Sequence, residues 1–296
     1  MPLISNFTNR NSRVDDPVYN MGFDHYENYF NNFYFIIGDF YPILNNIEYN
    51  KPKIILTLEE PNFCRKDLIH SSILENEDKV LTICPYTSES LSNRQFVFFP
   101  FFEKNIPQKT TKIYDVIYSG SSNKQFVSSL IDEMLPYNYI FINFDNDPRA
   151  NRPKVSYLEK INLYAQSKVT ICHNLLWPDL VDIPHYKEFK NSKNNRAFDK
   201  LYQDNPICEM PQIKSRVFEA AFSHSIILCA YDDWNIIEHF FEPDKEFIYF
   251  RDQKDLKEKL YQIINNYEKY EFIANNAFER AINNYTTKHF VQKFLT

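Results

Sequence analysis

Short apolar runs alternate with amphipathic stretches through the second half of the chain, and this alternation restricts the fold more than any other feature. Runs typical of buried strands lie at 116–118, 139–144, 169–172, 226–230 and 247–250. Helical periodicity is found at 126–134, 157–165, 217–222, 234–241, 256–264 and 270–282. Because parallel strands joined by helices connect through right-handed crossovers, the pattern predicts an α/β doubly wound sheet.

The first half carries a weaker strand pattern. Apolar runs bounded by Pro, Gly or Asp predict buried strands at 34–37, 54–58, 80–84 and 96–102. Residues 1–30 are polar and aromatic without clear periodicity, which predicts an arm or an irregular first element. The polar segment 103–112 contains a proline and is typical of a linker. We therefore predict two domains, 1–108 with the N-terminal arm and 109–296.

Charge and cysteine usage restrict the class of protein. The net charge is −6 and no long basic run is present, so we expect no nucleic-acid partner. The apolar run 96–102 is far too short to span a bilayer. The five cysteines form no CxxC pair, and the polar N-terminus does not resemble a signal peptide. We expect a soluble, cytoplasmic protein without a transmembrane segment.

Glycine is scarce, with three residues in the whole chain, so each position is informative. Gly38 and Gly120 directly follow predicted strands, which predicts a positive φ or a close backbone approach. After Gly120 come Ser121, Ser122 and Asn123, ahead of a predicted helix. Backbone amides at a helix start favour phosphate, although these residues are also ordinary helix caps. A GxGxxG motif is missing, which argues against a dinucleotide-dependent enzyme.

The segment 214–228 is the most informative, and it reads Lys-Ser-Arg-Val-Phe-Glu-Ala-Ala-Phe-Ser-His-Ser-Ile-Ile-Leu. It resembles the GT-B glycosyltransferases, many of which carry a helix with a cation, an apolar residue, Glu-Ala and a small-residue turn into a strand. The resemblance implies that Glu219 accepts hydrogen bonds from the ribose of a donor nucleotide. It also implies that Arg216 neutralises the donor diphosphate, with Lys214 and Val217 in the same donor site.

The chemistry of these two residue types agrees with that implication. A guanidinium can stabilise the negative charge that grows on a nucleoside diphosphate leaving group. A carboxylate one helical turn away can accept hydrogen bonds from a vicinal diol. Arg216 and Glu219 are three residues apart and share a helix face, so an ordinary surface ion pair between them is the alternative.

The resemblance continues downstream. The segments 232–234, 240–243 and 246–250, followed by a helix from Asp255, match the C-terminal domain of group 1 glycosyltransferases in order and spacing, over roughly 113–292. It implies that Phe247, Ile248 and Tyr249 lie near the nucleobase. His224 stands where this family usually has Gly.

Parts of the chain are also similar to the α-1,3-fucosyltransferases. Residues 57–63, Thr-Leu-Glu-Glu-Pro-Asn-Phe, look like the strand-end Thr-Gly-Glu-Asn of that family with its following Pro-Asn-Phe. The family Glu is a general base, which places Glu59 in that role and leaves Glu60 as an offset alternative. Asp39, directly after Gly38, is a third candidate base.

Two other polar motifs follow predicted strands. His173 and Asn174 come after the run 169–172, where they are expected on the rim of a cleft, in contact with substrate or in a capped turn. Asp145 and Asp147 have the DxD spacing that binds Mn²⁺ in GT-A enzymes, which is a rival hypothesis. Neither a HExxH motif nor a compact group of metal ligands is visible, so we expect no metal and no cofactor.

We therefore predict a metal-independent GT-B glycosyltransferase with two Rossmann-like domains facing a central cleft. The first domain would bind a glycan or other hydroxyl acceptor, and the second a nucleotide sugar. A UDP-sugar is favoured; a GDP-sugar-dependent, fucosyltransferase-like enzyme and a catalytically silent nucleotide-sugar-binding protein are the alternatives. The aromatic segment 17–35 is a candidate homodimer contact. The predicted donor site comprises Gly120, Ser121, Ser122, Asn123, His173, Asn174, Lys214, Arg216, Val217, Glu219, Phe247, Ile248 and Tyr249.

We expect Glu59→Gln to lower kcat by about 10²–10⁴-fold while donor affinity stays near normal, because a general base acts on the acceptor proton alone. Steady-state kinetics at saturating donor measure the effect. Glu60 and Asp39 compete for this role. A wild-type rate in Glu59→Gln, together with an inactive Asp39→Asn that still binds donor, would transfer the role to Asp39.

Overall fold

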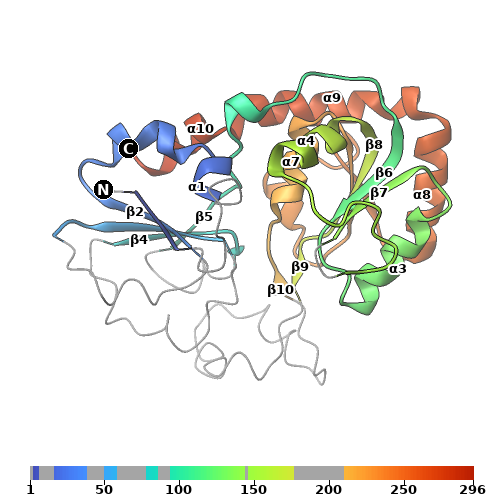
Figure 1. Cartoon of the computed structure of the whole chain (residues 1–296), viewed down its shortest axis with the longest axis horizontal. Coiled ribbons are helices and arrows are strands. Elements are labelled where there is room, and N and C mark those ends of the chain that lie inside the picture. Colours follow the sequence, from blue (N-terminus) through green and yellow to red (C-terminus); the bar gives the residue numbers. More distant parts are fainter. Residues whose placement is uncertain are drawn as a thin grey trace. The chain divides into compact units, whose positions relative to one another are not determined.

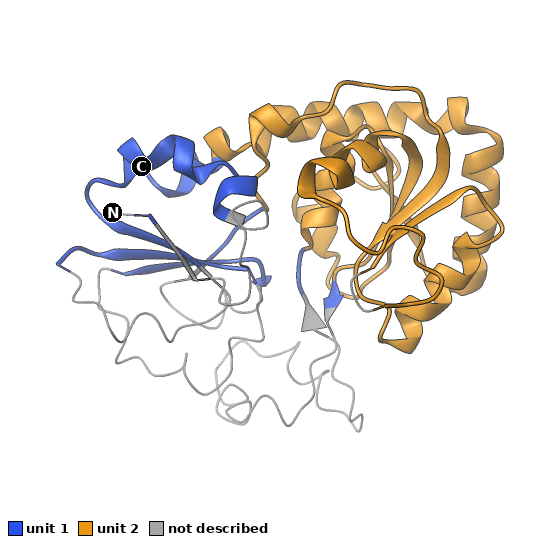
Figure 2. Cartoon of the chain, in the orientation of Figure 1, with its two compact units in different colours: residues 1–98, 175–213, 290–296 blue, residues 99–174, 214–289 orange. Residues whose placement is uncertain are grey.

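The computed structural model describes residues 3–6, 17–38, 50–58, 78–85, 94–143, 146–176 and 210–296. The chain forms two compact units (Figure 2). Unit 1 comprises Met1–Phe98, Leu175–Ile213 and Phe290–Thr296, and unit 2 comprises Phe99–Asn174 and Lys214–His289. The sequence predicted one boundary at 108/109, whereas the chain first enters unit 2 at Phe99 and later returns to unit 1 twice. The assignment of acceptor and donor to the two domains stays a prediction.

A five-stranded sheet forms the centre of unit 2. Its strands are β6 (Tyr114–Ser119), β7 (Tyr139–Ile142), β8 (Ser167–Cys172), β11 (Ile226–Ala230) and β12 (Ile248–Phe250). They are hydrogen-bonded in the order β12-β11-β8-β6-β7, and every neighbouring pair is parallel. The predicted α/β doubly wound sheet is therefore confirmed for this half. The strand order reverses between β6 and β8, because β7 lies on one side of β6 and the later strands on the other.

Helices lie on both sides of this sheet (Figure 1). They are α3 (Gln125–Met134), α4 (Tyr157–Ala165), α7 (Ser215–Phe222), α8 (Gln253–Asn265) and α9 (Tyr267–Asn284), with 3₁₀ helices η5 (Glu103–Asn105) and η7 (Ile236–His239). α4 packs against α7, and α3 packs against α8. α3 buries Val127, Leu130, Ile131 and Met134, which share one helix face. Among the described helices, none has the length and apolarity needed to cross a membrane.

The helix predicted at 234–241 is wrong in length. Only the 3₁₀ helix η7 forms there. Asn235 before it is left-handed, with φ of 51°, and Phe240 after it leaves the helical region. A left-handed residue at the start and a non-helical one at the end prevent a longer α-helix.

Unit 1 contains a second parallel sheet with strands in sequence order. The strands are β1 (Leu3–Asn6), β2 (Tyr34–Gly38), β3 (Lys53–Thr57), β4 (Lys79–Thr82) and β5 (Arg94–Phe96). A two-stranded antiparallel sheet of β9 (Leu175–Leu176) and β10 (Met210–Pro211) accompanies it. Gly38 and Thr57 are register partners, so β2 and β3 reach their carboxyl ends side by side.

The N-terminal segment is more regular than the sequence suggested. β1 pairs with β2 at the sheet edge, and the described residues 17–30 form α1 (Pro17–Asn20) and the 3₁₀ helix η2 (Phe23–Phe30). Phe23 and Phe30 are fully buried, and the ring of Phe23 lies 4.8 Å from that of Phe35. Phe23 also contacts Phe290 of α10 (Thr287–Phe294), with ring centroids 5.5 Å apart. Aromatic packing, which has no helical period here, orders this segment.

His224 fills a turn position that suits glycine. Its φ is 50°, so it adopts the left-handed backbone expected of the residue it replaces. Its ring stacks on Phe278 with centroids 3.8 Å apart, and Nδ1 lies 3.3 Å from Asn275 Oδ1. These contacts with α9 offset the strain of the left-handed backbone.

Lys112 joins the carboxyl-terminal ends of two helices. Its ammonium donates to the carbonyl of Ala165, the last residue of α4, at 2.8 Å, and to that of Ser223, after α7, at 3.4 Å. Carbonyls at helix ends favour a cation. Burial nevertheless lowers the pKa of Lys112 to about 7, with the nearby charge of Lys109 as a smaller cause.

We expect the wild-type protein to gain free energy of unfolding relative to Lys112→Met as the pH rises from 7 to 9. The unfolded lysine keeps its proton up to about pH 10.4, whereas the folded one releases it from about pH 7. The difference is at most about 1.4 kcal/mol per pH unit. Urea unfolding at several pH values measures it, with Lys254→Met, whose side chain is 86% exposed, as the control. Parallel pH profiles for wild type and Lys112→Met would contradict the prediction.

Candidate functional site

The carboxyl ends of β6 and β8 meet where the strand order of unit 2 reverses. In open α/β sheets, ligands bind beyond the strands at such a reversal, because the loops diverge and leave room. Gly120 follows β6, and His173 follows β8.

Gly120 makes room for the guanidinium of Arg216, in the first turn of α7. A Cβ on Gly120 would lie 2.6 Å from Arg216 Nη2 and 3.0 Å from the Tyr118 hydroxyl oxygen. Its φ is 153°, a region that disfavours other residues. The sequence predicted either a positive φ or a close approach, and the structure has both.

Arg216 lies over the aromatic ring of Tyr118, with its guanidinium carbon 4.8 Å from the ring centroid. The side chain is half-buried, and its Nη1 is shielded from solvent without a hydrogen-bond partner among the described residues. A buried N–H group without an acceptor is costly. The arrangement therefore suits an anionic ligand that supplies the missing acceptor.

Tyr118 links the two strand ends. Its hydroxyl lies 3.1 Å from His173 Nε2 and donates to the Ser121 carbonyl at 3.3 Å. His173 is only 5% exposed, so its side chain is buried rather than on the rim where the sequence placed it. Its ring also meets the edge of Phe126 on α3. His173 thus fixes Tyr118, on which Arg216 rests.

Asn174 is completely buried and has a packing role. Its Oδ1 accepts from the backbone amide of Lys214 at 3.2 Å, and its Nδ2 lies 3.5 Å from Cys229 Sγ. Lys214 is the N-cap of α7. Asn174 therefore fixes where α7 begins, which sets the position of Arg216. The side chain of Val217, also in the predicted donor site, is fully buried and packs in the core.

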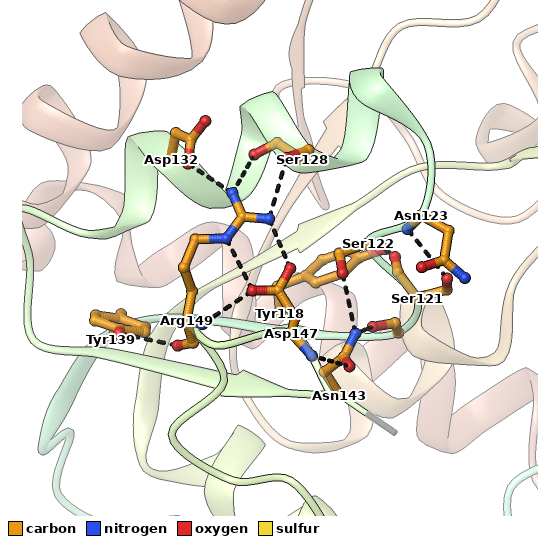
Figure 3. A network of polar contacts seen from close by, with 11 residues as sticks. Tyr118, Ser121, Ser122, Asn123, Ser128, Asp132, Tyr139, Asn143, Asp147 and Arg149 are labelled. Carbon is orange, nitrogen blue, oxygen red and sulfur yellow. Dashed lines mark hydrogen bonds and ion pairs between the residues drawn. The ribbon is translucent and has the colours of Figure 1, made fainter. Parts of the chain in front are cut away.

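Asn143, which directly follows β7, holds the loop after Gly120 in place through hydrogen bonds (Figure 3). Asn143 Nδ2 donates to the Gly120 carbonyl at 3.0 Å and to Ser122 Oγ at 3.3 Å. Asn123 donates its backbone amide to Ser121 Oγ. The N-cap of α3 is Lys124, whose side chain makes no capping hydrogen bond. Ser121, Ser122 and Asn123 therefore shape the loop, and none of them is the N-cap of α3.

Asp147 is part of the same hydrogen-bond network, because its backbone amide donates to Asn143 Oδ1 at 3.3 Å. Arg149 holds both its oxygens, with Nε 3.0 Å from Oδ1 and Nη2 2.6 Å from Oδ2, and also reaches Asp132 at 2.6 Å (Figure 3). Hydrogen bonds from Arg149 hold the pKa of Asp147 well below its usual range. The carboxylate is thus engaged by a cation within the protein. Asp145, the other half of the DxD motif, lies outside the described residues, and the described ones form no group of three or more metal ligands.

Glu219 lies one turn after Arg216 on α7 and is 3% exposed. Its Oε1 accepts from Lys160 Nζ of α4 at 2.7 Å. Among the described residues, no ion pair joins Arg216 to Glu219, so the alternative of a local surface pair is not formed. Sequence reasoning missed Lys160, because a partner 59 residues away leaves no periodic signal.

The three residues predicted near a base differ in exposure. Phe247 and Ile248 are buried, at 0% and 7% exposed. Tyr249 is half-buried, its hydroxyl donates to Glu238 Oε1 at 3.1 Å, and its ring meets the ring of Tyr231 at 5.4 Å. Tyr231, which directly follows β11, is 43% exposed. Of the predicted three, only Tyr249 presents an aromatic surface, and Tyr231 extends it.

Asp232, two residues after the end of β11, is another buried acid of unit 2. Its Oδ1 accepts from the amides of Trp234 and Ile236 at 3.1 and 3.3 Å. Burial raises the pKa of this carboxyl to about 6, against the effect of those amides. Asp232 belongs to the segment 232–234, which the sequence analysis used only for its likeness to a family pattern. Asp232 shapes the turn into η7.

The three candidate bases, Asp39, Glu59 and Glu60, lie outside the described residues. Their assignment stays a prediction.

Comparison with known proteins identifies the type of fold. Residues 124–296 match a family model described as glycosyl transferase-like. No curated protein sequence gives a significant match. Anabaena HepE, solved in complex with UDP-glucose, is similar in structure with a TM-score of 0.57 at 10% identity, over 88% of this chain and 76% of HepE.

Two further solved structures are similar. Sucrose-phosphate synthase from Thermosynechococcus elongatus has a TM-score of 0.57 at 9% identity, over 94% of this chain and 75% of the synthase. The pneumococcal O-GlcNAc transferase GtfA, in complex with UDP and GlcNAc, has a TM-score of 0.53 at 10% identity, over 88% of this chain and 55% of GtfA. With the two parallel sheets, these likenesses confirm the predicted GT-B fold class.

We expect Gly120→Ala to lower the free energy of unfolding by about 1–3 kcal/mol, the usual cost of a strained backbone. Part of this cost comes from the clash with Arg216 and should fall in an Arg216→Ala background. Urea unfolding of the four variants in this cycle measures the coupling. Ser121→Ala, at an exposed position, is the control. An equal cost in both backgrounds would show that the Arg216 contact is unimportant.

Proposed function

Because the chain belongs to the glycosyl transferase-like family, we propose that it transfers a sugar from a UDP-sugar to a hydroxyl acceptor. The observation that carries this proposal is the Arg216 guanidinium, whose buried Nη1 has no hydrogen-bond partner among the described residues. The diphosphate of a nucleotide sugar offers charged oxygens that can satisfy it. Its place at the strand reversal is where an α/β sheet binds nucleotides.

The leaving group explains why a fixed cation is useful. As the sugar departs, negative charge grows on the β-phosphate of the nucleoside diphosphate. Arg216 is held in place by Tyr118 before the reaction, so it stabilises this charge without reorganising. Backbone amides in the first turns of α3 and α7 add positive potential at the same sheet edge. In this proposal a metal ion is not needed for departure of the nucleotide.

The choice of UDP is supported by two of the similar structures. HepE was solved with UDP-glucose, and GtfA with UDP and GlcNAc. Tyr231 and Tyr249 present an aromatic surface, which suits stacking of a base but does not select one. A GDP-sugar is therefore kept as the second arm of the binding test.

The acceptor hydroxyl would be deprotonated by an acid of unit 1 in an inverting reaction. Gly38 and Thr57 are adjacent at the carboxyl edge of that sheet. Asp39 follows Gly38 directly, and Glu59 comes two residues after Thr57. Glu60, the third candidate, comes directly after Glu59. All three candidates thus follow neighbouring strand ends, which supports one of them as the base.

We expect UDP to bind in the presence of EDTA, and Arg216→Ala to weaken binding by about 1.5–3 kcal/mol, the scale of a hydrogen bond to a charged group. Titration calorimetry with UDP and with GDP measures both effects. Arg152→Ala is the matched control, because Arg152 donates to its neighbour Asn151. Binding that requires Mn²⁺ or Mg²⁺, or that is unaffected by Arg216→Ala, would contradict the proposed donor site.

Turnover separates an enzyme from a silent binding protein. Release of UDP from UDP-glucose or UDP-GlcNAc, with a hydroxyl acceptor panel, is the direct assay. Tight UDP binding without release from any donor would favour the silent alternative.

A further inference from the structure

An ion pair between α4 and α7 holds the carboxylate of Glu219. Lys160 Nζ lies 2.7 Å from Glu219 Oε1, and the two side chains are 20% and 5% exposed. The same ammonium lies 4.9 Å from the centroid of the Tyr157 ring, one turn earlier on α4. Lys160 is therefore fixed between an aromatic face and a carboxylate.

The pair is too buried to be an ordinary surface salt bridge. Tyr164 beside it is 0% exposed. Burial, and after it the charge of Glu219, raises the pKa of both Tyr157 and Tyr164 well above the usual value. A carboxylate in such surroundings is stable only with a partner, because an unpaired buried charge costs several kcal/mol. Lys160 supplies the partner.

The pair uses only half of the carboxylate. Lys160 engages Oε1, while Oε2 accepts no hydrogen bond within the described part of the chain. Tyr164 interacts with the charges of both Glu219 and Arg216, which places the pair next to the guanidinium site. One carboxylate oxygen is thus held, and the other is available beside the proposed diphosphate position.

We propose that Lys160 is a positioning residue, which neutralises and orients Glu219 so that Oε2 accepts hydrogen bonds from the vicinal ribose hydroxyls of the bound nucleotide. The inference rests on the proposed function. It assigns Lys160 no contact with the nucleotide. Its effect should therefore be seen only with ligands that carry the ribose hydroxyls.

The test compares UDP with 2′,3′-dideoxyuridine diphosphate by titration calorimetry. For the wild type, loss of the two hydroxyls should raise the Kd by about 10-fold or more. Lys160→Met should raise the Kd of UDP about 10-fold and leave that of the dideoxy analogue unchanged. The ratio of the dideoxy Kd to the UDP Kd should therefore fall to about 1. Lys160→Arg keeps the charge and should restore most of the ratio.

Lys160→Met leaves an unpaired buried carboxylate and is the variant at risk of misfolding. Glu219→Gln and the double variant Lys160→Met/Glu219→Gln avoid that charge. Both should have a ratio near 1, and adding Lys160→Met to Glu219→Gln should cause no further loss of UDP affinity. Circular dichroism and thermal unfolding check the fold of each variant.

The outcomes separate this inference from the proposed function. If Lys160→Met or the double variant keeps the wild-type ratio, or binds UDP more tightly than its parent, Lys160 does not position Glu219 for ribose. If the wild type itself binds neither UDP nor GDP, the proposed function fails first. A wild-type ratio of 1 with intact, Arg216-dependent UDP binding would overturn the ribose role while the donor site stands.

Discussion

The guanidinium of Arg216 occupies space that a side chain on Gly120 would fill, and the carboxyl edge of unit 2 is arranged around that contact. Tyr118 supports it from β6, and His173 fixes Tyr118 from β8. Asn174, the next residue, sets the start of α7 through the amide of Lys214. Three elements distant in sequence thereby hold one cation in a fixed position, which is the condition for stabilising charge without reorganisation.

Much of this could be predicted from the sequence, because periodicity and glycine scarcity are local signals. The sheet of unit 2 follows from short apolar runs separated by helices, and Gly120 was marked by its place after a strand. Arg216 and Glu219 were found through a motif confined to one helix turn. By contrast, β1 and η2 were missed. β1 is only four residues long, and aromatic burial rather than a helical period orders η2.

What the sequence could not provide was the network that supports these residues. Lys160 and Arg149 act through partners on other elements or in turns, and nothing in the local pattern distinguishes them from surface cations. Asn174 was expected to meet a ligand, yet its polar atoms are used inside unit 2. Strand ends carry polar residues that face a ligand and polar residues that support the loops. Only their neighbours in the folded structure distinguish the two.

Unit 1 is assembled from three separate segments of the chain, so its parts are synthesised at different times. Its three segments are separated by the whole of unit 2, and the last of them supplies Phe290, which packs on Phe23 and Phe98. During synthesis, every residue of unit 2 leaves the ribosome before these rings can meet. Unit 2 can thus close around its own sheet first, before Phe23 and Phe98 gain their contacts with Phe290. The aromatic packing of unit 1 is therefore completed only after all of unit 2 has been synthesised.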